Sequence, residues 1–290
     1  MSFRRLLMVD GAAHLYRSFF GIKGLSSRDG KPTNAVYGFI RAIHQFQHVW
    51  NPTHIVVAWD GGTPVERLER LPSYKSQRPP MPEALREQIA PIMEYLELAA
   101  VPVIRLERQE ADDVLASLAT WASAEGADET LIASSDKDLF QLVDDRVSLI
   151  AGAKDEPKMG PEAVRAKTGV HPAQIVDWLA LTGDAADNIP GVEGLGPKTA
   201  ARLLEQFGSL EALWPRLAEV ESERIRSRLE AARALVENNV QLIRLRRDLA
   251  CAPGWDALAV RPESPAKLRP FYERLEFHSL LKGLEQPSLL

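Results

Sequence analysis

The chain has almost no cysteine and no long apolar run. Cys251 is the single cysteine among 290 residues, so neither an internal disulfide nor a cysteine-based metal site can form. No stretch approaches the roughly 20 apolar residues of a membrane-spanning helix. The short N-terminal apolar run is interrupted at Asp10, as in a first strand rather than a signal peptide. We therefore expect no membrane association and a reducing, cytoplasmic setting.

Internal repeats and low-complexity tracts are also absent. With 45% hydrophobic and 26% charged residues, the composition excludes a disordered or fibrous chain. The length allows one large domain or two modest ones, each with a real core. Nothing in the composition demands more than a monomer.

The net charge of −5 conceals an acidic middle. Residues 1–100 sum to +3, residues 101–190 to −9 and residues 191–290 to +1. A solvated acidic surface is the ordinary interpretation of such a block. The placement of the acids decides whether that interpretation holds here.

Short apolar runs recur, with helical patterns between them. The runs cover residues 6–10, 54–59, 101–104, 129–134 and 147–152, and they lack strict alternation, as strands buried on both faces do. Apolar residues with a 3.6-residue period lie between them, from Leu85 to Leu96 and from Val114 to Trp121. This alternation predicts a mostly parallel, doubly wound α/β sheet.

The pattern changes near residue 160. From there the chain reads as helices punctuated by Gly and Pro, without a convincing strand. We predict an α/β domain over residues 1–155 and a helical domain over residues 156–290.

Residues 61–82 are too long for an ordinary strand-to-helix connection. The segment carries Arg67, Arg70, Lys75 and Arg78 around Tyr74. A basic stretch with an aromatic residue is typical of contact with a nucleic-acid backbone and a stacked base. A mobile surface loop is the alternative.

Seven carboxylates stand at or just after the C-terminal ends of four predicted strands. They are Asp10 after the first strand, Asp60 after the second, Glu110, Asp112 and Asp113 at the start of the helix after the third, and Asp136 and Asp138 after the fourth. A single Asp in such a place is usually a helix N-cap. Because parallel strands end at one edge of a sheet, however, the seven side chains should converge there.

Such crowding is costly unless the negative charges are neutralised. Lys or Arg residues do not stand beside most of these acids in the sequence, so divalent cations are expected to neutralise them. Ligation by oxygen alone favours Mg²⁺ or Mn²⁺ over zinc. Two such ions about 4 Å apart can promote hydrolysis of a phosphodiester.

Two more acids, Asp184 and Asp187, lie in the helical part. Their spacing would put both on one face of a helical turn, with an Asx turn at a helix end as the alternative. The following residues, 191–200, read GVEGLGPKTA and indicate a hairpin between two helices. Its glycines would free backbone N–H groups near a helix N-terminus, and Lys198 would add charge, as in a phosphate-binding site without base specificity.

Six segments, in order, resemble the motifs of the bacterial and phage 5′ nucleases: VDGAAHLYR, AWDGG, YKSQRPPMP, EADDVLASLA, SSDKDLFQLV and GDAADNIPGVEGLGPKTA. The similarity is greatest to the N-terminal 5′-3′ exonuclease domain of DNA polymerase I, which is related to the flap endonucleases, and it spans residues 5–285. It implies a PIN-like sheet and a helix-hairpin-helix element at about residues 184–205. It also implies a structure-specific 5′ nuclease that hydrolyses DNA near junctions of single strand and duplex.

The resemblance also assigns roles to individual residues. One metal would be held by Asp10, Asp60, Glu110 and Asp112 with Asp113 beside them, and the other by Asp136, Asp138 and Asp184 with Asp187 close by. Residues 61–82 correspond to a helical arch for the single-stranded 5′ end. Within it, Lys75 matches the catalytic-site lysine and Arg78 the basic residue one turn on.

DNA contacts follow from the same resemblance. Tyr16 matches an aromatic residue that stacks on a base, Tyr74 matches the arch tyrosine, and the hairpin would grip duplex backbone and hold K⁺. The full expected DNA-binding set is Tyr16, Arg17, Arg67, Arg70, Tyr74, Gly191, Gly194, Gly196, Lys198 and Thr199. RNA primer–DNA hybrids and a DNA polymerase are further expected partners, in replication and repair.

The sequence departs from the family after Asp60, where a usual Thr-Phe-Arg run is reduced to its arginine, Arg67. No polymerase domain follows residue 290, so we expect either a free-standing nuclease or an isolated domain.

Two alternative functions remain: a DNA-binding paralogue with little catalysis, and an RNA-directed nuclease with a related acidic edge. The arginines at 224, 226, 228, 244, 246 and 247 form either a backbone-tracking face or a solvated helix surface.

Overall fold

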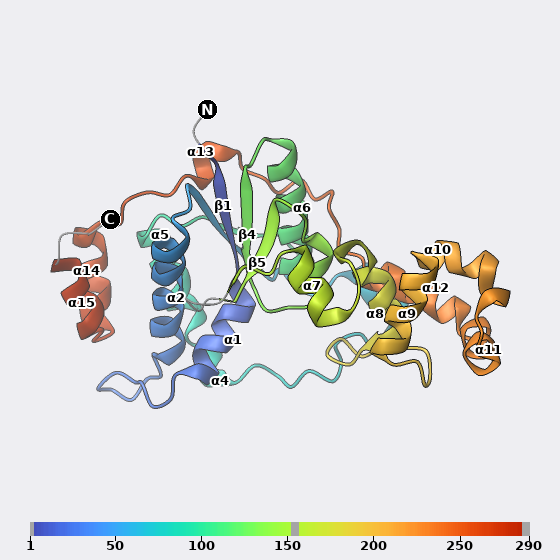
Figure 1. The fold of residues 1–290 in the computed structure, drawn as a ribbon. Helices are drawn as coiled ribbons and strands as arrows, with labels where there is room; N and C mark the ends of the chain where they lie inside the picture. Colours follow the sequence, from blue (N-terminus) through green and yellow to red (C-terminus); the bar gives the residue numbers. More distant parts are fainter. Residues whose placement is uncertain (1–2, 152–156, 286–290) are drawn as a thin grey trace.

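The computed structural model describes residues 3–151 and 157–285. Five parallel strands form its central sheet in the order β3-β2-β1-β4-β5 (Figure 1). They are β1 (Arg5–Asp10), β2 (His54–Trp59), β3 (Val103–Arg105), β4 (Glu129–Ala133) and β5 (Val147–Ile150). The predicted parallel sheet is therefore present, with its topological switch between β1 and β4.

The two faces of the sheet bury separate cores. Leu6 and Met8 of β1 pack into one core, whereas Leu7 and Val9 pack into the other, because successive side chains of a strand point to opposite faces. One face is covered by α1 (Gly11–Gly21), α2 (Asn34–Trp50) and α5 (Ile89–Leu98), the other by α6 (Ala111–Ala124). Helices on both faces explain the continuous apolar runs of the strands.

The third strand begins two residues later than its apolar run. The N–H of Val101 donates to Leu96 O at 2.8 Å and closes the end of α5. Val101 therefore belongs to the turn after the helix, and β3 starts only at Val103.

Residues beyond β5 are mainly helical. The helices are α7 (Pro161–Thr168), α8 (Ile175–Thr182), α9 (Pro197–Phe207), α10 (Leu210–Leu213), α11 (Glu223–Ala231) and α12 (Arg233–Ile243), and short 3-10 turns cover Pro172–Gln174 and Trp214–Glu219. A further 3-10 turn, Asp138–Leu142, lies between β4 and β5. In Figure 1 most of these helices extend away from the sheet on one side. Among the described residues, no helix is both long and apolar enough to cross a membrane.

The expectation of no strand in this part is wrong. β6 (Gly183–Asp184) pairs antiparallel with β7 (Ile189–Pro190). Gly183 permits this pair, because its φ of 77° is in the left-handed region and an added Cβ would lie 2.4 Å from Gly191 N.

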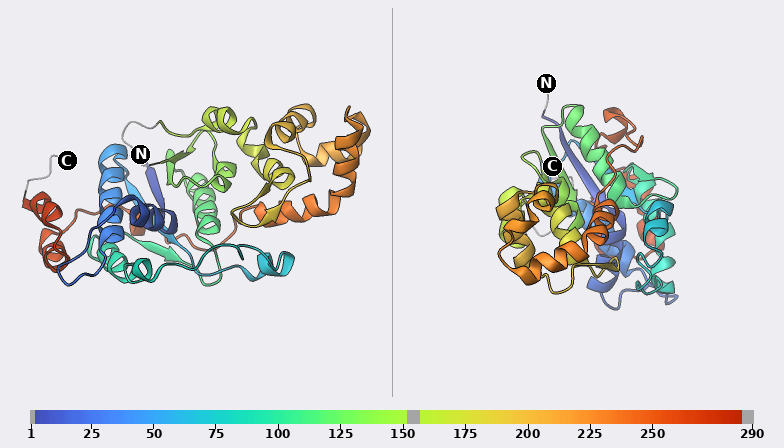
Figure 2. Two further views of the ribbon diagram at one scale, coloured as in Figure 1. Left: turned by 90° about the horizontal axis from the view of Figure 1, so that it is seen from below. Right: turned by 90° about the vertical axis from the view of Figure 1, so that its right-hand side faces the viewer.

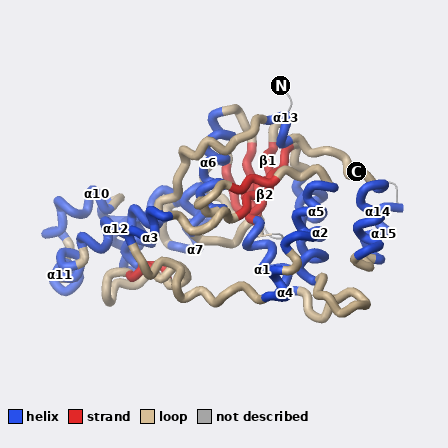
Figure 3. Tube along the Cα trace, turned by 180° about the vertical axis from the view of Figure 1, so that it is seen from behind, coloured by secondary structure: helices blue, strands red, loops and turns tan. Residues whose placement is uncertain are grey.

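The last part of the chain returns to the sheet, which the two-domain prediction did not foresee. After α13 (Trp255–Leu258), Val260 N donates to Thr53 O at 3.0 Å. The helices α14 (Pro265–Arg274) and α15 (His278–Glu285) then lie on the α2 and α5 side, at the opposite end from α11 (Figures 2 and 3). The helical segment 160–243 is thus inserted between parts of one α/β body.

Residues 61–82 form an ordered connection over the acidic edge. They contain α3 (Val65–Arg70) and a series of turns before α4 (Glu83–Arg86). The backbone N–H of Lys75 donates to Asp187 O at 3.0 Å, and Asn188 Nδ2 donates to Ser73 O at 2.9 Å. These bonds fix the segment against the β6–β7 turn, contrary to the alternative of a mobile surface loop.

Candidate metal centre and nucleic-acid interface

Asp10 and Asp60 each cap a helix at the carboxyl edge of the sheet. Asp10 Oδ1 accepts from Ala13 N at 3.0 Å at the start of α1, and Asp60 Oδ1 accepts from Ala111 N at 2.8 Å at the start of α6. Burial, with repulsion from Asp60 and Asp136, raises the pKa of Asp10 to about 6. The capping role and the predicted convergence of the acids are therefore both present.

The same edge holds Asp112, Asp136 and Asp138. Burial, with repulsion from Asp10 and Asp136, raises the pKa of Asp112 well above its usual value. Burial also raises the pKa of Asp138, with repulsion from Asp136 and Asp184. Mutual repulsion of this kind requires the carboxylates to lie close together, so acids from separate strand ends form one electrostatic cluster.

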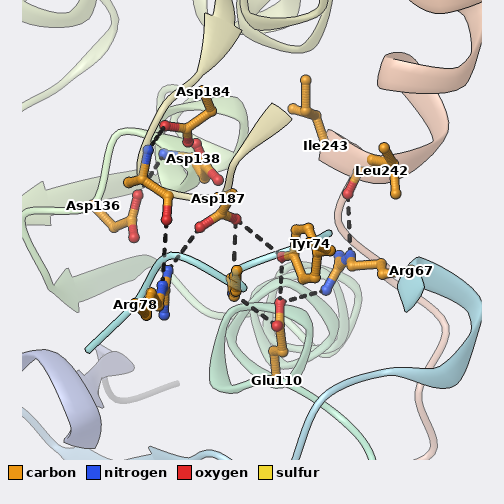
Figure 4. Close-up of polar contacts among 12 residues, drawn as sticks. Arg67, Tyr74, Arg78, Glu110, Asp136, Asp138, Asp184, Asp187, Leu242 and Ile243 are labelled. Atoms are coloured by element: carbon orange, nitrogen blue, oxygen red, sulfur yellow. Dashed lines mark hydrogen bonds and ion pairs between the residues drawn. The ribbon is translucent and has the colours of Figure 1, made fainter. Parts of the chain in front are cut away.

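Asp184 and Asp187 reach this cluster from the helical part. They do not lie on a helical turn, as their spacing suggested, because α8 ends at Thr182. Asp184 ends β6, and Asp187 lies in the turn between β6 and β7. Asp184 Oδ1 accepts from Ala186 N at 2.9 Å. This Asx-type turn still directs both carboxylates toward Asp138 (Figure 4).

Two observations indicate that Asp138, Asp184 and Asp187 could hold a metal ion. Asp138, Asp184 and Asp187 each offer one oxygen within 4.8 Å of the others. Asp138 Oδ1 is buried and has no hydrogen-bond partner among the described residues. An unpartnered buried carboxylate oxygen is costly, and a hard divalent cation prefers oxygen ligands of this type.

Basic side chains neutralise several of the acids, which corrects the expectation that they would stand alone. Glu110 accepts from Lys75 Nζ at 2.7 Å, from Arg67 Nη1 at 2.6 Å and from Tyr74 OH at 3.1 Å. Both Glu110 oxygens are therefore occupied by donors of residues 61–82 (Figure 4). The sequence did not reveal these pairs because the partners are 35 to 43 residues apart.

Both oxygens of Asp113 accept from a basic side chain, and its place beside a metal ion stays a prediction. Arg67 Nη1 and Nη2 donate to its two oxygens at 2.7 and 2.8 Å, and Arg246 N donates to Oδ1 at 2.9 Å. Its position one residue after Asp112 turns it to a different face of α6. Arg67 also donates to Leu242 O at 3.1 Å, so this pair joins α3, α6 and the end of α12.

Arg67 and Tyr74 are consequently not placed as exposed DNA contacts. They are 6% and 5% exposed, respectively. Tyr74 OH donates to Asp187 Oδ2 at 3.0 Å as well as to Glu110. Because each polar group finds its partner inside the protein, neither side chain presents a free stacking or phosphate-binding surface here.

Lys75 and Arg78, the predicted catalytic pair, both border the cluster. Lys75 Nζ lies 3.7 Å from Asp187 Oδ2, and Arg78 Nη2 donates to Asp187 Oδ1 at 2.7 Å. The carboxylates Glu110 and Asp187 raise the pKa of Lys75 against the effect of burial. Lys75 has a φ of 55°, a strained backbone conformation of the kind found at functional sites.

The other predicted contacts with DNA lie on the surface. Tyr16 stacks on Phe20 with ring centroids 6.4 Å apart on α1, the exposed Arg17 donates to Ala151 O, and Arg70 is exposed at the end of α3.

The predicted hairpin lies between β7 and α9. Gly196 N-caps α9, Lys198 is exposed in its first turn, and Thr199 N donates to Gly196 O at 3.0 Å. Gly191 leaves no room for a Cβ, which would lie 2.3 Å from the Thr182 carbonyl carbon. Within the described chain, the N–H groups of Gly194 and Gly196 have no hydrogen-bond acceptor. The hairpin therefore offers backbone donors beside a lysine.

Two polar partners of the cluster were missed in the sequence. Lys137 Nζ donates to Asp184 Oδ1 at 2.8 Å, and Ser134 Oγ donates to Asp10 Oδ2 at 2.9 Å. The available signal was their place in the segment SSDKD, where Ser134 stands two residues before Asp136 and Lys137 stands between Asp136 and Asp138.

Comparisons with protein families cover nearly the whole chain. The 5′-3′ exonuclease N-terminal resolvase-like domain matches residues 5–169, and the 5′-3′ exonuclease C-terminal SAM fold matches residues 170–266. The 5′-3′ exonuclease of Aquifex aeolicus is 38% identical over 98% of this chain and 96% of its own length. DNA polymerase I of Bacillus caldotenax is 37% identical over 98% of this chain, which spans only 33% of that relative.

Solved structures agree with the fold. The bacteriophage T5 flap endonuclease in complex with DNA and metal ions has a TM-score of 0.68 and 25% identity, covering 98% of this chain and 100% of its own. The catalytic core of Rad2 with a DNA substrate has a TM-score of 0.65 at 16% identity, over 98% of this chain and 92% of its own, and shows the fold alone. The predicted fold class is confirmed. Together, the matching family models and relatives show that the chain belongs to the 5′-3′ exonuclease family.

Proposed function

We propose that this chain is a structure-specific 5′ nuclease that hydrolyses DNA phosphodiester bonds near junctions of single strand and duplex. The observation that carries the proposal is the convergence of Asp138 from the sheet edge with Asp184 and Asp187 from the helical part. Beside them lie two basic side chains, Lys75 and Arg78. Acidic ligands next to cations suit a phosphate flanked by metal ions.

Seven carboxylates would hold two Mg²⁺ or Mn²⁺ ions: Asp10, Asp60, Asp112, Asp136, Asp138, Asp184 and Asp187. When bound, the ions supply activation of a water and neutralisation of the leaving oxygen. Glu110 and Asp113 act differently, since their oxygens accept from Arg67 and hold residues 61–82 in place.

Lys75 and Arg78 bind the scissile phosphate in this proposal. Both side chains already pair with Asp187, so a phosphate oxygen can take the place of that carboxylate oxygen as their acceptor. Their charge then opposes the negative charge that grows on the phosphate during attack.

The hairpin of residues 191–196 binds the duplex in this proposal. The N–H groups of Gly194 and Gly196 and the charge of Lys198 form a site for backbone phosphates without base contacts, and K⁺ is a candidate ion there. Tyr16 offers a ring on which a base can stack, and the single-stranded 5′ end passes residues 61–82.

The relatives that continue into DNA polymerase I support a role in primer or flap removal during replication and repair, in the cytoplasm and beside a polymerase.

The test is cleavage of a 5′-labelled flap duplex with Mg²⁺, with Mn²⁺ and with EDTA. We expect metal-dependent cleavage near the flap junction and none in EDTA. Asp138→Asn should abolish cleavage while sparing DNA binding, whereas the exposed Asp145→Asn should cleave normally. Tight DNA binding without cleavage under either metal would contradict the proposal and favour the non-catalytic paralogue.

A further inference from the structure

Five of the seven arginines from residue 224 to residue 247 fall into two groups. Arg246 and Arg247 face the α/β part, where Arg246 N donates to Asp113 Oδ1 at 2.9 Å and Arg247 Nη2 donates to Gln141 O at 2.7 Å. The arginines of α11 lie at the far end of the molecule from the sheet (Figure 1). The Arg247 side chain and the backbone of Arg246 therefore link the two parts of the chain.

Arg228 of α11 lies directly against the hairpin of residues 191–196. An added Cβ on Gly194 would be 1.6 Å from Arg228 Nη1, so the guanidinium occupies the space that a side chain would take. Gly194 also has a φ of 67°, which disfavours any other residue. The hairpin turn therefore has no side chain of its own on the side that faces α11, and the Arg228 guanidinium occupies that space.

The charge of Arg228 remains available. Its nearest acidic partner among the described residues is Glu193, at 4.0 Å, and the Glu193 side chain is 95% exposed. Such a long, solvated pair is weak, and Glu193 can turn away when another anion approaches. The Arg228 side chain is itself 27% exposed. Its guanidinium N–H groups are therefore accessible beside the N–H groups of Gly194 and Gly196, which have no acceptor among the described residues.

We propose that Arg228 is a duplex-binding residue that adds a guanidinium from α11 to the phosphate site of the hairpin. A guanidinium can donate two parallel hydrogen bonds to one phosphate. Because Arg224 lies one turn earlier on the same face of α11, it extends the contact to the next phosphate along the strand. This inference rests on the proposed function, and it assigns the hairpin's duplex contact to two elements rather than one.

The experiment measures affinity for a fluorescent duplex by anisotropy in EDTA, at several salt concentrations. Arg228→Ala should weaken binding about tenfold, and the slope of log Kd against log salt should fall by about one, as expected for one lost phosphate contact. Arg228→Lys should recover part of the affinity and the slope. Arg216→Ala is the matched control, an exposed arginine of the same region paired with Glu219 at 2.7 Å, and should change neither.

A purely structural role predicts a different pattern. If Arg228 only packed the hairpin, Arg228→Ala and Arg228→Lys would lose affinity equally and leave the slope unchanged, which would overturn the inference. In Gly194→Ala the added methyl group displaces Arg228 and also strains the turn. The slope of log Kd against log salt should therefore fall by more than one. Wild-type protein that neither binds nor cuts DNA would instead refute the proposed function itself.

Discussion

Adjacent aspartates at the start of α6 have opposite roles. Asp113 is bonded to Arg67 through both oxygens, whereas Asp112 faces only other acids and Lys75 at longer range. One residue of helix separates a side chain paired with a guanidinium from one whose charge is opposed by neighbouring carboxylates.

This contrast predicts stability changes of opposite sign in metal-free protein. Asp113→Asn leaves Arg67 buried with an incomplete partner and should lower the free energy of unfolding by about 3 kcal/mol. The raised pKa of Asp112 means that its charged form opposes folding above the usual carboxyl pKa. Asp112→Asn should therefore raise the free energy of unfolding at pH 8 in EDTA. Urea unfolding measures both, and equal losses would contradict the assignment.

His14 provides a pH-dependent test at the same scale. Its Nε2 bonds to Ala133 O at 3.0 Å in a buried site, and burial lowers its pKa from 6.5 to about 4. A histidine that folds neutral loses stability as pH falls through 6.5, because the unfolded chain takes up the proton first.

We expect this loss to reach roughly 3 kcal/mol at pH 4. In His14→Gln the amide cannot titrate. Between pH 6.5 and pH 4 the free energy of unfolding should therefore fall less steeply as the pH falls, by a slope that corresponds to about one proton taken up on unfolding. Urea midpoints at half-unit pH steps measure this slope. An unchanged acid limb would show that His14 titrates normally in the folded protein.

At the scale of elements, residues 61–82 depend on interactions that the sequence does not display. Tyr74 was expected on the DNA side of this segment, yet its hydroxyl donates to Glu110 and Asp187 in the core. Tyr74→Phe should lower the free energy of unfolding by about 1–2 kcal/mol and leave DNA affinity unchanged. A loss of DNA affinity at unchanged stability, by anisotropy and urea unfolding, would restore the stacking role.

Several elements were predictable and others were not. The five parallel strands followed from apolar runs, since strands buried on both faces need continuous hydrophobic sequence. The β6–β7 pair was missed because two-residue strands carry no periodic pattern, and the turn at Asp184 depends on Gly183 and a side-chain bond to Ala186. The carboxylates at the strand ends followed from topology, whereas the ion pair of Arg67 with Asp113 required knowing that α3 packs against α6.

At the scale of the whole molecule, part of the acidic middle of the sequence gathers at the junction of the sheet and the helical part. Asp138 comes from one and Asp184 and Asp187 from the other. An ion bound there stabilises the folded state and not the unfolded chain. Saturating Mg²⁺, at about 100 times its Kd, should therefore add about 2.7 kcal/mol per site, and EDTA should remove it. Thermal unfolding with and without Mg²⁺ checks this, with Asp145→Asn as control.

The central claim is that carboxylates from both parts of the chain form one metal centre. The most direct measurement is Mn²⁺ binding, followed by the electron paramagnetic resonance signal of free Mn²⁺, in wild-type, Asp138→Asn, Asp184→Asn and Asp145→Asn proteins. The account predicts two ions for wild-type and Asp145→Asn, and the loss of at least one ion in both Asp138→Asn and Asp184→Asn. Equal stoichiometry and affinity in all four proteins would contradict it.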